Sequence, residues 1–306
     1  MKLQQLRFVR EVARNGLNVS AAAHSLNTAQ PGVSSQIRQL EDELGVEIFL
    51  RHGKRLSGIT EPGYQVIAMI ERVLQDVDSI KRVADEFSRQ SSGRLSIATT
   101  HTQARYALPP AIKTFTERYP DVSLSIHQGN PTQICEYVLS GEADIAIATE
   151  AIASYDELVT MSCYDWNRCV IAPPGHAVFD IERLTLEHLA RFPIITYDYA
   201  FAGRSLINKA FADRGLQPDI VLTAIDSDVI KTYVELGLGV GILASVAYSA
   251  ERDPSLRALD ASHLFEVSTV RLGIRRGSYL RSYIYDFIQF FAPHLTREVV
   301  DEAMAA

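Results

Sequence analysis

Residues 20–55 read SAAAHSLNTAQPGVSSQIRQLEDELGVEIFLRHGKR, and this stretch decides how the chain is organised. Four apolar residues recur at helical spacing on one face of a predicted helix: Val33, Ile37, Leu40 and Leu44. Three polar residues fall four apart on the opposite face: Gln30, Ser34 and Arg38. One side of this helix is therefore expected to pack, and the other to reach outward.

A second, shorter helix is predicted just before it, at residues 21–26, with Ser20 as its N-cap. Thr28 is placed to cap the longer helix. Pro31 falls in the first turn of that helix, where a missing N–H leaves no intrahelical bond unmade. Two short helices joined by a tight turn predict a helix-turn-helix.

In a helix-turn-helix the second helix enters the major groove of double-stranded DNA, which is roughly 12 Å wide and admits a helix. Four polar residues are therefore expected to contact base edges: Gln30, Ser34, Ser35 and Arg38. Gln pairs with adenine and Arg with guanine through two hydrogen bonds each. The alternative is an amphipathic helix whose polar face is only solvated, and the combination of caps, turn and polar face opposes it.

The segment after this helix, residues 49–55, predicts a strand, a turn and a basic wing. Phosphate contacts, which fix the register on DNA without reading sequence, are expected from Thr28, Arg51, Lys54 and Arg55. The net charge of −7 hides a basic head, because residues 1–60 hold eight Lys and Arg against five Asp and Glu. A basic excess confined to this part favours DNA binding there.

A specific pattern runs through the first sixty or so residues: Ala22-Ala23, Leu26, Gln30-Pro31, Ser34, Ile37, Leu40-Glu41, Leu44-Gly45, Phe49, Arg51, Leu56, Thr60 and Gly63. This pattern resembles the winged helix-turn-helix of LysR-type transcriptional regulators. The resemblance implies a DNA-binding regulator that responds to a small molecule, with RNA polymerase as a further candidate partner.

Composition bounds the remaining classes of protein. A chain of 306 residues with 47% apolar and 22% charged residues predicts a soluble protein of two or three domains. The three cysteines have no metal-ligand spacing, so no metal, cofactor or disulfide framework is expected. The N-terminus carries charges throughout, unlike a signal peptide, and no segment approaches the roughly 20 apolar residues of a membrane span. A cytoplasmic protein without a membrane partner is expected.

Residues 61–89 predict a long helix with a heptad pattern. One heptad position holds Gly63, Ile70, Val77 and Ala84, and the other holds Val66, Val73, Ile80 and Phe87. This seam is expected to pair with a second copy of the chain as a homodimer. The alternative is a long helix that packs on its own domain.

A polar hinge at residues 88–93 precedes alternating strands and helices, which predict an α/β fold with a mainly parallel sheet. Strands are expected at 95–99, 122–128, 145–148, 168–172, 194–196, 219–224, 240–244 and 269–273. Helices are expected at 102–119, 131–140, 184–190, 205–214, 227–238 and 279–292.

The LysR-type resemblance implies a domain plan with two crossovers, as in a periplasmic binding protein. The head would span 1–60, the linker helix 61–89 and the effector-binding domain 90–306. Within the last, subdomain I would comprise about 93–162 and 268–306, and subdomain II about 163–267. The family resemblance also implies a homotetramer, built as a dimer of dimers.

An anion site is expected where the predicted strand 95–99 ends and the next helix begins, at Thr99-Thr100-His101-Thr102-Gln103. Free N–H groups and the helix dipole favour anions at such a junction, and ligands of open α/β sheets gather at this edge. Residues 148–150 and 201–205 form two comparable junctions. The alternative is that these threonines only cap helices.

Several longer segments resemble the cysteine-regulon branch of the LysR family: 99–109, 117–134, 143–151, 163–168, 228–244 and 281–300. The resemblance implies control of sulfur, cysteine or sulfonate assimilation genes, and an effector such as sulfate, thiosulfate, N-acetylserine or O-acetylserine. Carried over by motif, the effector-binding residues are Thr100, Thr102, Gln103, Thr149 and Ala202. At Ala202 these relatives carry Thr, so one hydroxyl donor is lost and backbone N–H groups remain.

Three other functions are alternatives to this predicted regulator of sulfur genes. A LysR-type regulator of another pathway differs only in its effector. A solute-binding protein would have no use for residues 1–89, and an enzyme would need a catalytic constellation. No orienting motif for catalysis accompanies the candidate pair of His101 with Asp226 or Asp228, or the candidate nucleophiles Cys163 and Cys169.

Residues 237–241, GLGVG, follow a predicted helix and enter a strand, which is the reverse of a dinucleotide-binding loop. Trp166 is equally compatible with the cleft and with the core.

Overall fold

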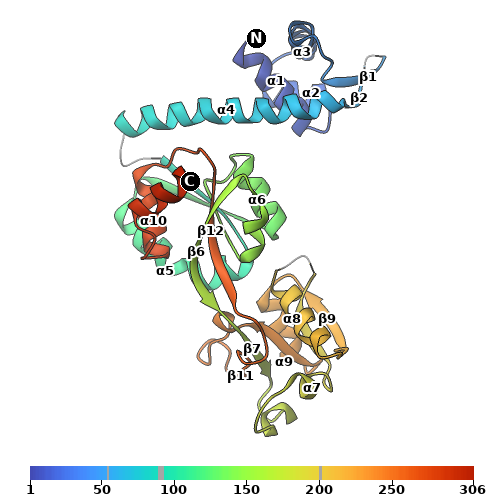
Figure 1. The fold of residues 1–306 in the computed structure, drawn as a ribbon, viewed down its shortest axis with the longest axis vertical. Coiled ribbons are helices and arrows are strands. Elements are labelled where there is room, and N and C mark those ends of the chain that lie inside the picture. The colour runs from blue at the N-terminus through green and yellow to red at the C-terminus, as the bar shows by residue number, and fades with distance from the viewer. Residues whose placement is uncertain (54, 89–92, 200–201) are drawn as a thin grey trace. The chain divides into compact units, whose positions relative to one another are not determined.

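The computed structural model describes residues 1–53, 55–88, 93–199 and 202–306. They belong to two compact units, Met1–Ser88 and Arg89–Ala306, and each is treated by itself (Figure 1). Lys54, most of the predicted polar hinge and Phe201 lie outside the described residues. No helix among the described residues is long and apolar enough to span a bilayer.

The first unit is a helix-turn-helix followed by a two-stranded wing and a long helix. Its elements are α1 (Leu3–Arg14), α2 (Val19–Ser25), α3 (Gln30–Leu44), β1 (Phe49–His52), β2 (Arg55–Ile59) and α4 (Glu61–Ser88). β1 and β2 pair antiparallel. Val33, Ile37 and Leu40 of α3 are buried in one core with α1 and α2, as their spacing predicts.

The helix starts differ from the prediction. Asn18 caps α2, where its side chain accepts hydrogen bonds from the Ser20 and Ala21 N–H groups. α3 begins after Ala29 without a side-chain cap, so Thr28 does not cap it. Both predictions were wrong because α2 begins two residues before the expected position and α3 one residue after it, and capping requires the residue just before the first turn. Pro31 does stand in the first turn of α3.

Two residues assigned to packed faces are exposed. Leu3 is 45% exposed and Leu44 is 40% exposed. Each lies in the terminal turn of its helix, α1 and α3, and α3 ends directly afterwards at Gly45 with a φ of 70°. Ile48 and Phe49 fill the core beyond that turn instead and are fully buried.

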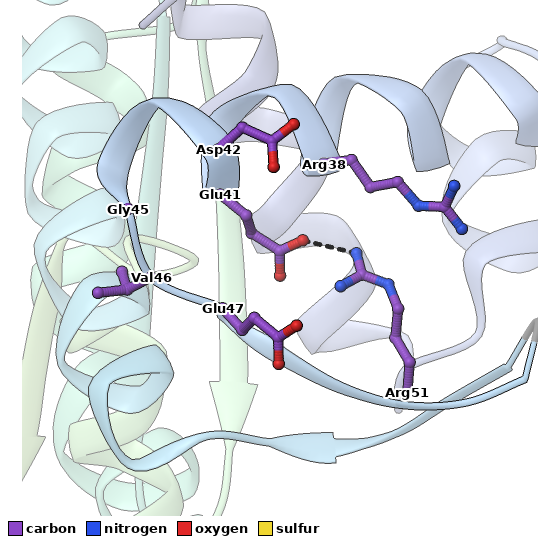
Figure 2. A pocket seen from close by; sticks show the side chains of 7 residues that line it. All are labelled: Arg38, Glu41, Asp42, Gly45, Val46, Glu47 and Arg51. Carbon is purple, nitrogen blue, oxygen red and sulfur yellow. Dashed lines mark hydrogen bonds and ion pairs between the residues drawn. The ribbon is translucent and has the colours of Figure 1, made fainter.

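Glu41 joins α3 to the wing (Figure 2). Its Oε1 accepts hydrogen bonds from the Ile48 N–H at 2.9 Å and the Phe49 N–H at 3.1 Å. Its Oε2 lies 2.6 Å from Nη2 of Arg51. Glu41 is only 5% exposed, so these charge-assisted bonds form largely away from water. One carboxylate therefore sets the start of β1 and the orientation of Arg51.

Part of the apolar face of α4 that was predicted to form the dimer seam packs against the head of its own unit. Ile70 and Leu74 are buried in the core of the head, and a Cβ on Gly63 would lie 2.1 Å from the carbonyl oxygen of Ile48. The assignment of Gly63 and Ile70 to a dimer seam was therefore wrong, because the head needs that face of the helix to close its core. A separate apolar stripe stays exposed at Met69 (59%), Val73 (41%) and Ile80 (69%).

The second unit contains two five-stranded sheets. The first has the order β4-β3-β5-β12-β6 and the second β11-β7-β10-β8-β9. The first consists of β3 (Gly93–Thr99), β4 (Val122–Gln128), β5 (Ile145–Ala148), β6 (Leu158–Trp166) and β12 (Ser268–Arg275). The second consists of β7 (Arg168–Ala172), β8 (Ile194–Tyr197), β9 (Ile220–Ala224), β10 (Val240–Ala244) and β11 (Arg257–Asp260).

Helices and short turns cover both faces of each sheet. Those of the first sheet are the π-helix η1 (Gln103–Ala107), α5 (Leu108–Arg118), α6 (Pro131–Leu139), η2 (Glu150–Ser154), α10 (Ser282–Phe291) and α11 (Arg297–Ala305). Those of the second are η3 (Ala177–Asp180), α7 (Leu186–Leu189), α8 (Ala202–Asp213), α9 (Ser227–Glu235) and η4 (Ser245–Ala247). We call the two halves subdomain I, around the first sheet, and subdomain II, around the second.

The prediction of a mainly parallel sheet was wrong. In each sheet two neighbouring pairs are parallel and two are antiparallel. The reason is that both chain crossovers bring strands back in the reverse direction. β6 and β12 pair from Leu158↔Arg275 to Trp166↔Ser268, and Figure 1 shows them side by side. β7 then starts at Arg168, one residue after β6 ends.

The segment at 237–241 forms the end of a helix and a tight turn into a strand. Gly237 has a φ of 78°, which favours glycine, and follows the end of α9. A Cβ on Gly239 would lie 2.3 Å from the carbonyl oxygen of Pro193, so only glycine allows this approach of two backbones.

We predict that Glu41→Ala destabilises the head by roughly 3 kcal/mol, because Arg51 and two backbone N–H groups lose their acceptor. The matched control is Glu47→Gln, a charge removed from an exposed neighbour, which should stay within about 0.5 kcal/mol. Native-state hydrogen exchange of the α1 and α3 amides measures both values. Equal effects of the two substitutions would show that Glu41 does not hold the wing.

Candidate functional site

The first candidate site is the outer face of α3. Gln30, Ser35 and Arg38 are exposed and Ser34 is half-buried, so the structure brings all four predicted base-contacting residues to the side away from the head core. Arg38 also lines a surface hollow of about 560 Å³ at the end of α3, together with Arg51 (Figure 2). A helix with such side chains along its first turns has the form that enters a major groove.

The predicted phosphate contacts flank this helix. Thr28 is exposed in the turn between α2 and α3, and Arg55 is exposed at the start of β2. Arg51 is three-quarters buried as a side chain and is paired with Glu41, a partner that sequence reasoning did not find. This pairing uses one nitrogen of the guanidinium and leaves further N–H donors on it.

The second candidate site is a cavity of about 40 Å³ in the second unit. It is lined by Thr100, His101, Thr102, Gln103, Thr149, Trp166, Tyr197, Gly203 and Ile225. Four of the predicted effector residues are therefore gathered in one place. The fifth, Ala202, begins α8 directly before Gly203, and its side chain is not described. The volume corresponds to roughly three water-sized groups. We call this space the anion cavity.

Strand ends place the hydroxyls. Thr100 follows β3 and Thr149 follows β5, and these two strands are parallel neighbours with Thr99 opposite Ile147. Thr102 is the residue before the π-helix η1. Tyr197, which ends β8 of the second sheet, faces them from subdomain II. The cavity thus lies where the carboxyl ends of strands from both sheets meet, the usual ligand position in α/β proteins.

Two tyrosines hold the polar lining in place. Gln103 is 1% exposed, and its Oε1 accepts a hydrogen bond from the Tyr164 hydroxyl. The Tyr197 hydroxyl accepts from the Ala244 N–H at 3.0 Å and lies 2.8 Å from Oγ of Ser227. Burial raises the pKa of both Tyr164 and Tyr197, so both hydroxyls are neutral at physiological pH.

Buried positive charge lies behind the cavity wall. Arg168 is fully buried, and its guanidinium bonds the carbonyl oxygens of Glu266 at 2.9 Å and Gly203 at 3.3 Å, and Oγ of Ser268 at 3.0 Å. Burial lowers the pKa of Arg168, yet a guanidinium keeps its proton in proteins. Arg204, 2% exposed, bonds the carbonyl oxygen of Tyr197 at 3.0 Å.

The lining also presents polar atoms that have no hydrogen-bond partner among the described residues. They include Nε1 of Trp166 and Nδ1 of His101, both of which are shielded from solvent. Trp166 lines the cavity and also packs against the hydrophobic core of subdomain I, so both roles left open by the sequence are present. Tyr197, Arg168 and Ile225 carry no local signal that would mark them as cavity residues.

The residues considered for catalysis have other surroundings. Nε2 of His101 lies 3.9 Å from Oδ2 of Asp228, too far for a hydrogen bond, and Asp226 caps α9. Burial raises the pKa of Cys163 and Cys169 to about 12, so both thiols are protonated at neutral pH. Within the described ranges no group of three or more His, Cys, Asp or Glu is arranged to hold a metal ion.

Known proteins resemble the chain along nearly its whole length. Residues 3–64 match the bacterial regulatory helix-turn-helix protein model of the lysR family, and residues 88–296 match the LysR substrate binding domain. The chain is 56% identical over 295 residues to the HTH-type transcriptional regulator SsuR of Burkholderia cenocepacia, covering 96% of each protein. It is 54% identical over 304 residues to CysB of the same organism, covering 99% of this chain and 97% of that protein.

A solved structure supports the same relationship. The cofactor-binding domain of the Cbl transcriptional regulator superposes with a TM-score of 0.68 at 44% identity, covering 71% of this chain and 95% of that domain. The two family models together span both units of the structure. The chain therefore belongs to the LysR family of DNA-binding transcriptional regulators, with a substrate-binding domain behind its helix-turn-helix.

Proposed function

We propose that this regulator is cytoplasmic and controls genes of sulfur, cysteine or sulfonate assimilation in response to a small anion. The observation that carries the proposal is the anion cavity, in which Thr100, Thr102, Gln103 and Thr149 converge from two neighbouring strand ends. The similarity of the chain to SsuR and CysB supports the pathway. A regulator of another pathway would share the fold and bind a different effector.

The cavity favours a small oxyanion or a carboxylate. Its lining offers hydroxyl and N–H donors, and the guanidinium of Arg168 lies behind Gly203. Hydrogen bonds to an ionised partner are about twice as strong as neutral ones, which favours an anion over a neutral metabolite. Sulfate, thiosulfate, and the carboxylates of N-acetylserine and O-acetylserine fit this chemistry. No cofactor or catalytic step is part of the proposal.

The DNA side of the proposal places α3 in the major groove of a promoter, with Gln30, Ser34, Ser35 and Arg38 at base edges. Thr28, Arg51, Lys54 and Arg55 contact phosphates. The exposed stripe Met69, Val73 and Ile80 of α4 pairs with a second copy, because water otherwise faces a row of large apolar side chains. A dimer of dimers follows as the assembly, with RNA polymerase as a partner at the promoter.

Effector binding acts through the two subdomains. The cavity wall takes Thr100 and Thr149 from subdomain I and Tyr197 and Gly203 from subdomain II. An anion held by both sides stabilises the arrangement in which they approach, and so shifts the population of conformations. The assembly passes this shift on to the spacing and bending of the DNA between half-sites.

The effector site is tested by Thr100→Val, which keeps the shape of the side chain and removes its hydroxyl. We expect binding of sulfate or thiosulfate to weaken about tenfold, since a hydrogen bond to an ionised partner contributes about 1.5–3 kcal/mol. Ala202→Thr should tighten oxyanion binding by restoring the donor expected from the resemblance. Calorimetry with sulfate, thiosulfate and the two acetylserines measures both variants. Unchanged affinity for every ligand in both would place the effector elsewhere.

Base reading is tested by Arg38→Ala. We expect specific promoter binding to weaken by roughly 1–3 kcal/mol while binding to scrambled DNA changes little. The control Arg55→Ala removes a phosphate contact, so it should weaken both and reduce the salt slope by about 1. Fluorescence anisotropy over a salt series distinguishes the two patterns. An equal loss on both DNAs for Arg38→Ala would assign Arg38 to phosphate instead.

Dimerisation is tested by Ile80→Asp, which places a charge on the exposed stripe of α4. Burying an unpaired ion costs several kcal/mol, so the variant should form a smaller assembly. Ala68→Asp is the matched control, because it adds the same charge to an exposed position on a different face of α4. Light scattering on the two variants gives the assembly mass. A parental mass for Ile80→Asp would exclude the stripe as the interface.

A further inference from the structure

A polar contact joins the two subdomains beside the anion cavity. Tyr106 belongs to the π-helix η1, which follows β3 of the first sheet, and Lys231 belongs to α9, which packs on the second sheet. Nζ of Lys231 donates a hydrogen bond to the Tyr106 hydroxyl at 2.9 Å. That hydroxyl in turn donates to Oδ1 of Asp228 at 2.5 Å. The Tyr106 hydroxyl therefore lies between a cation and an anion of the opposite subdomain.

Lys231 is held firmly in this place. Besides Tyr106, its Nζ lies 2.9 Å from Oδ1 of Asp253, 3.1 Å from Oδ1 of Asp228 and 3.2 Å from the carbonyl oxygen of Ala247. The side chains of Lys231 and Asp253 are each only 10% exposed. Burial alone would lower the pKa of Lys231, but the hydrogen bonds that its ammonium donates to Tyr106, Asp253 and Asp228 outweigh this effect, and the pKa is raised. Lys231 is therefore a charged donor whose position is set within subdomain II.

The ring of Tyr106 is also anchored in subdomain II. It packs against the hydrophobic cluster that contains Ile230 and Val234 of α9. The guanidinium of Arg252 lies 5.3 Å from its centroid, and Nζ of Lys231 lies 5.1 Å from it. A residue that belongs by sequence to subdomain I thus has its main contacts in subdomain II.

The same π-helix carries part of the anion cavity. Gln103 begins η1, three residues before Tyr106, and Thr102 directly precedes it. π-helical turns are rare and occur frequently at functional sites, because they set side chains in directions that an α-helix does not allow. Fixing Tyr106 therefore fixes the turn of backbone that aims Gln103 and Thr102 into the cavity.

We propose that Lys231 is a positioning residue for effector binding, which acts through the Tyr106 hydroxyl on the π-helix and never touches the effector. The proposal rests on the anion cavity being the effector site. In this proposal, the contact between Tyr106 and Lys231 couples the binding of an effector in the cavity to the approach of the two subdomains. Such a coupling has typical magnitudes of about 5-fold to 150-fold in affinity.

The test uses Tyr106→Phe in the full-length protein, since this change removes one hydroxyl and keeps the ring. Hydrogen exchange of the peptide spanning 100–108 should become about tenfold faster without any ligand, and sulfate and thiosulfate should bind about fivefold more weakly or worse. Tyr285→Phe is the matched control, because it removes a tyrosine–aspartate hydrogen bond, to Asp301, inside subdomain I. The control should change neither reading.

A double-variant cycle separates positioning from general stability. Lys231→Met should weaken sulfate binding at least as much as Tyr106→Phe. The double variant should lose less than the sum of the two single losses, because both changes break the contact between Tyr106 and Lys231. If Lys231→Met does not fold, Tyr106→Phe with its control decides the matter. Unchanged exchange or unchanged affinity in Tyr106→Phe overturns the proposal.

Thr100→Val in the same titrations distinguishes the two levels of the argument. Weaker binding in Thr100→Val with parental binding in Tyr106→Phe refutes the positioning role of Lys231 and leaves the anion cavity in place. Parental binding in Thr100→Val, or no binding of either anion by the parent protein, refutes the cavity as the oxyanion site and with it the role of Lys231.

Discussion

The antiparallel pairing of β6 with β12 is the constraint on which the effector-binding unit depends. The chain crosses from one sheet to the other twice, and both crossings leave this strand pair at the same end, after Trp166 and before Ser268. Arg168 lies at that point and bonds the carbonyl oxygen of Glu266 and the hydroxyl of Ser268, so it fastens one crossing to the other. Any change in the angle between the subdomains must therefore pass through a segment of few residues.

Arg168 also connects this crossing to the anion cavity. Its Nη2 bonds the carbonyl oxygen of Gly203, which lines the anion cavity, and its guanidinium carbon lies 5.0 Å from the centroid of the Trp166 ring, which lines it too. A charge that enters the cavity acts on a guanidinium from which water is excluded, where electrostatic interactions are stronger than at the surface. The crossing between the sheets and the anion cavity are thus connected through the contacts of Arg168.

Local sequence patterns predicted the elements whose burial is regular, and failed where tertiary contacts decide. The bounds of β4, β5, β7 and β10 agree with the prediction because these strands are short apolar or alternating runs. β6 was missed, since its mixture of buried and exposed residues follows from its place at the edge of the first sheet. The antiparallel direction of the strands that follow the two crossings has no local signal in the sequence. The same holds for β11 and α11. Ile70 was assigned to the wrong partner because a heptad pattern does not say which apolar surface covers it.

The site divides in the same way. Thr100, Thr102, Gln103 and Thr149 were found because strand ends and helix starts are visible in sequence, and motif resemblance agreed. Tyr197, Arg168 and the contact between Tyr106 and Lys231 join segments up to 125 positions apart, which no local pattern encodes.

These long-range groups also bear on the presence of Ala202 where the resemblance leads us to expect Thr. On the proposal that the cavity binds an anion, a lost hydroxyl removes one hydrogen bond to an ionised partner, about 1.5–3 kcal/mol, whereas the buried guanidiniums of Arg168 and Arg204 stay in place. Because directed donors give specificity and charge gives attraction, we expect Ala202 to reduce discrimination among anions more than it reduces the proposed anion binding itself.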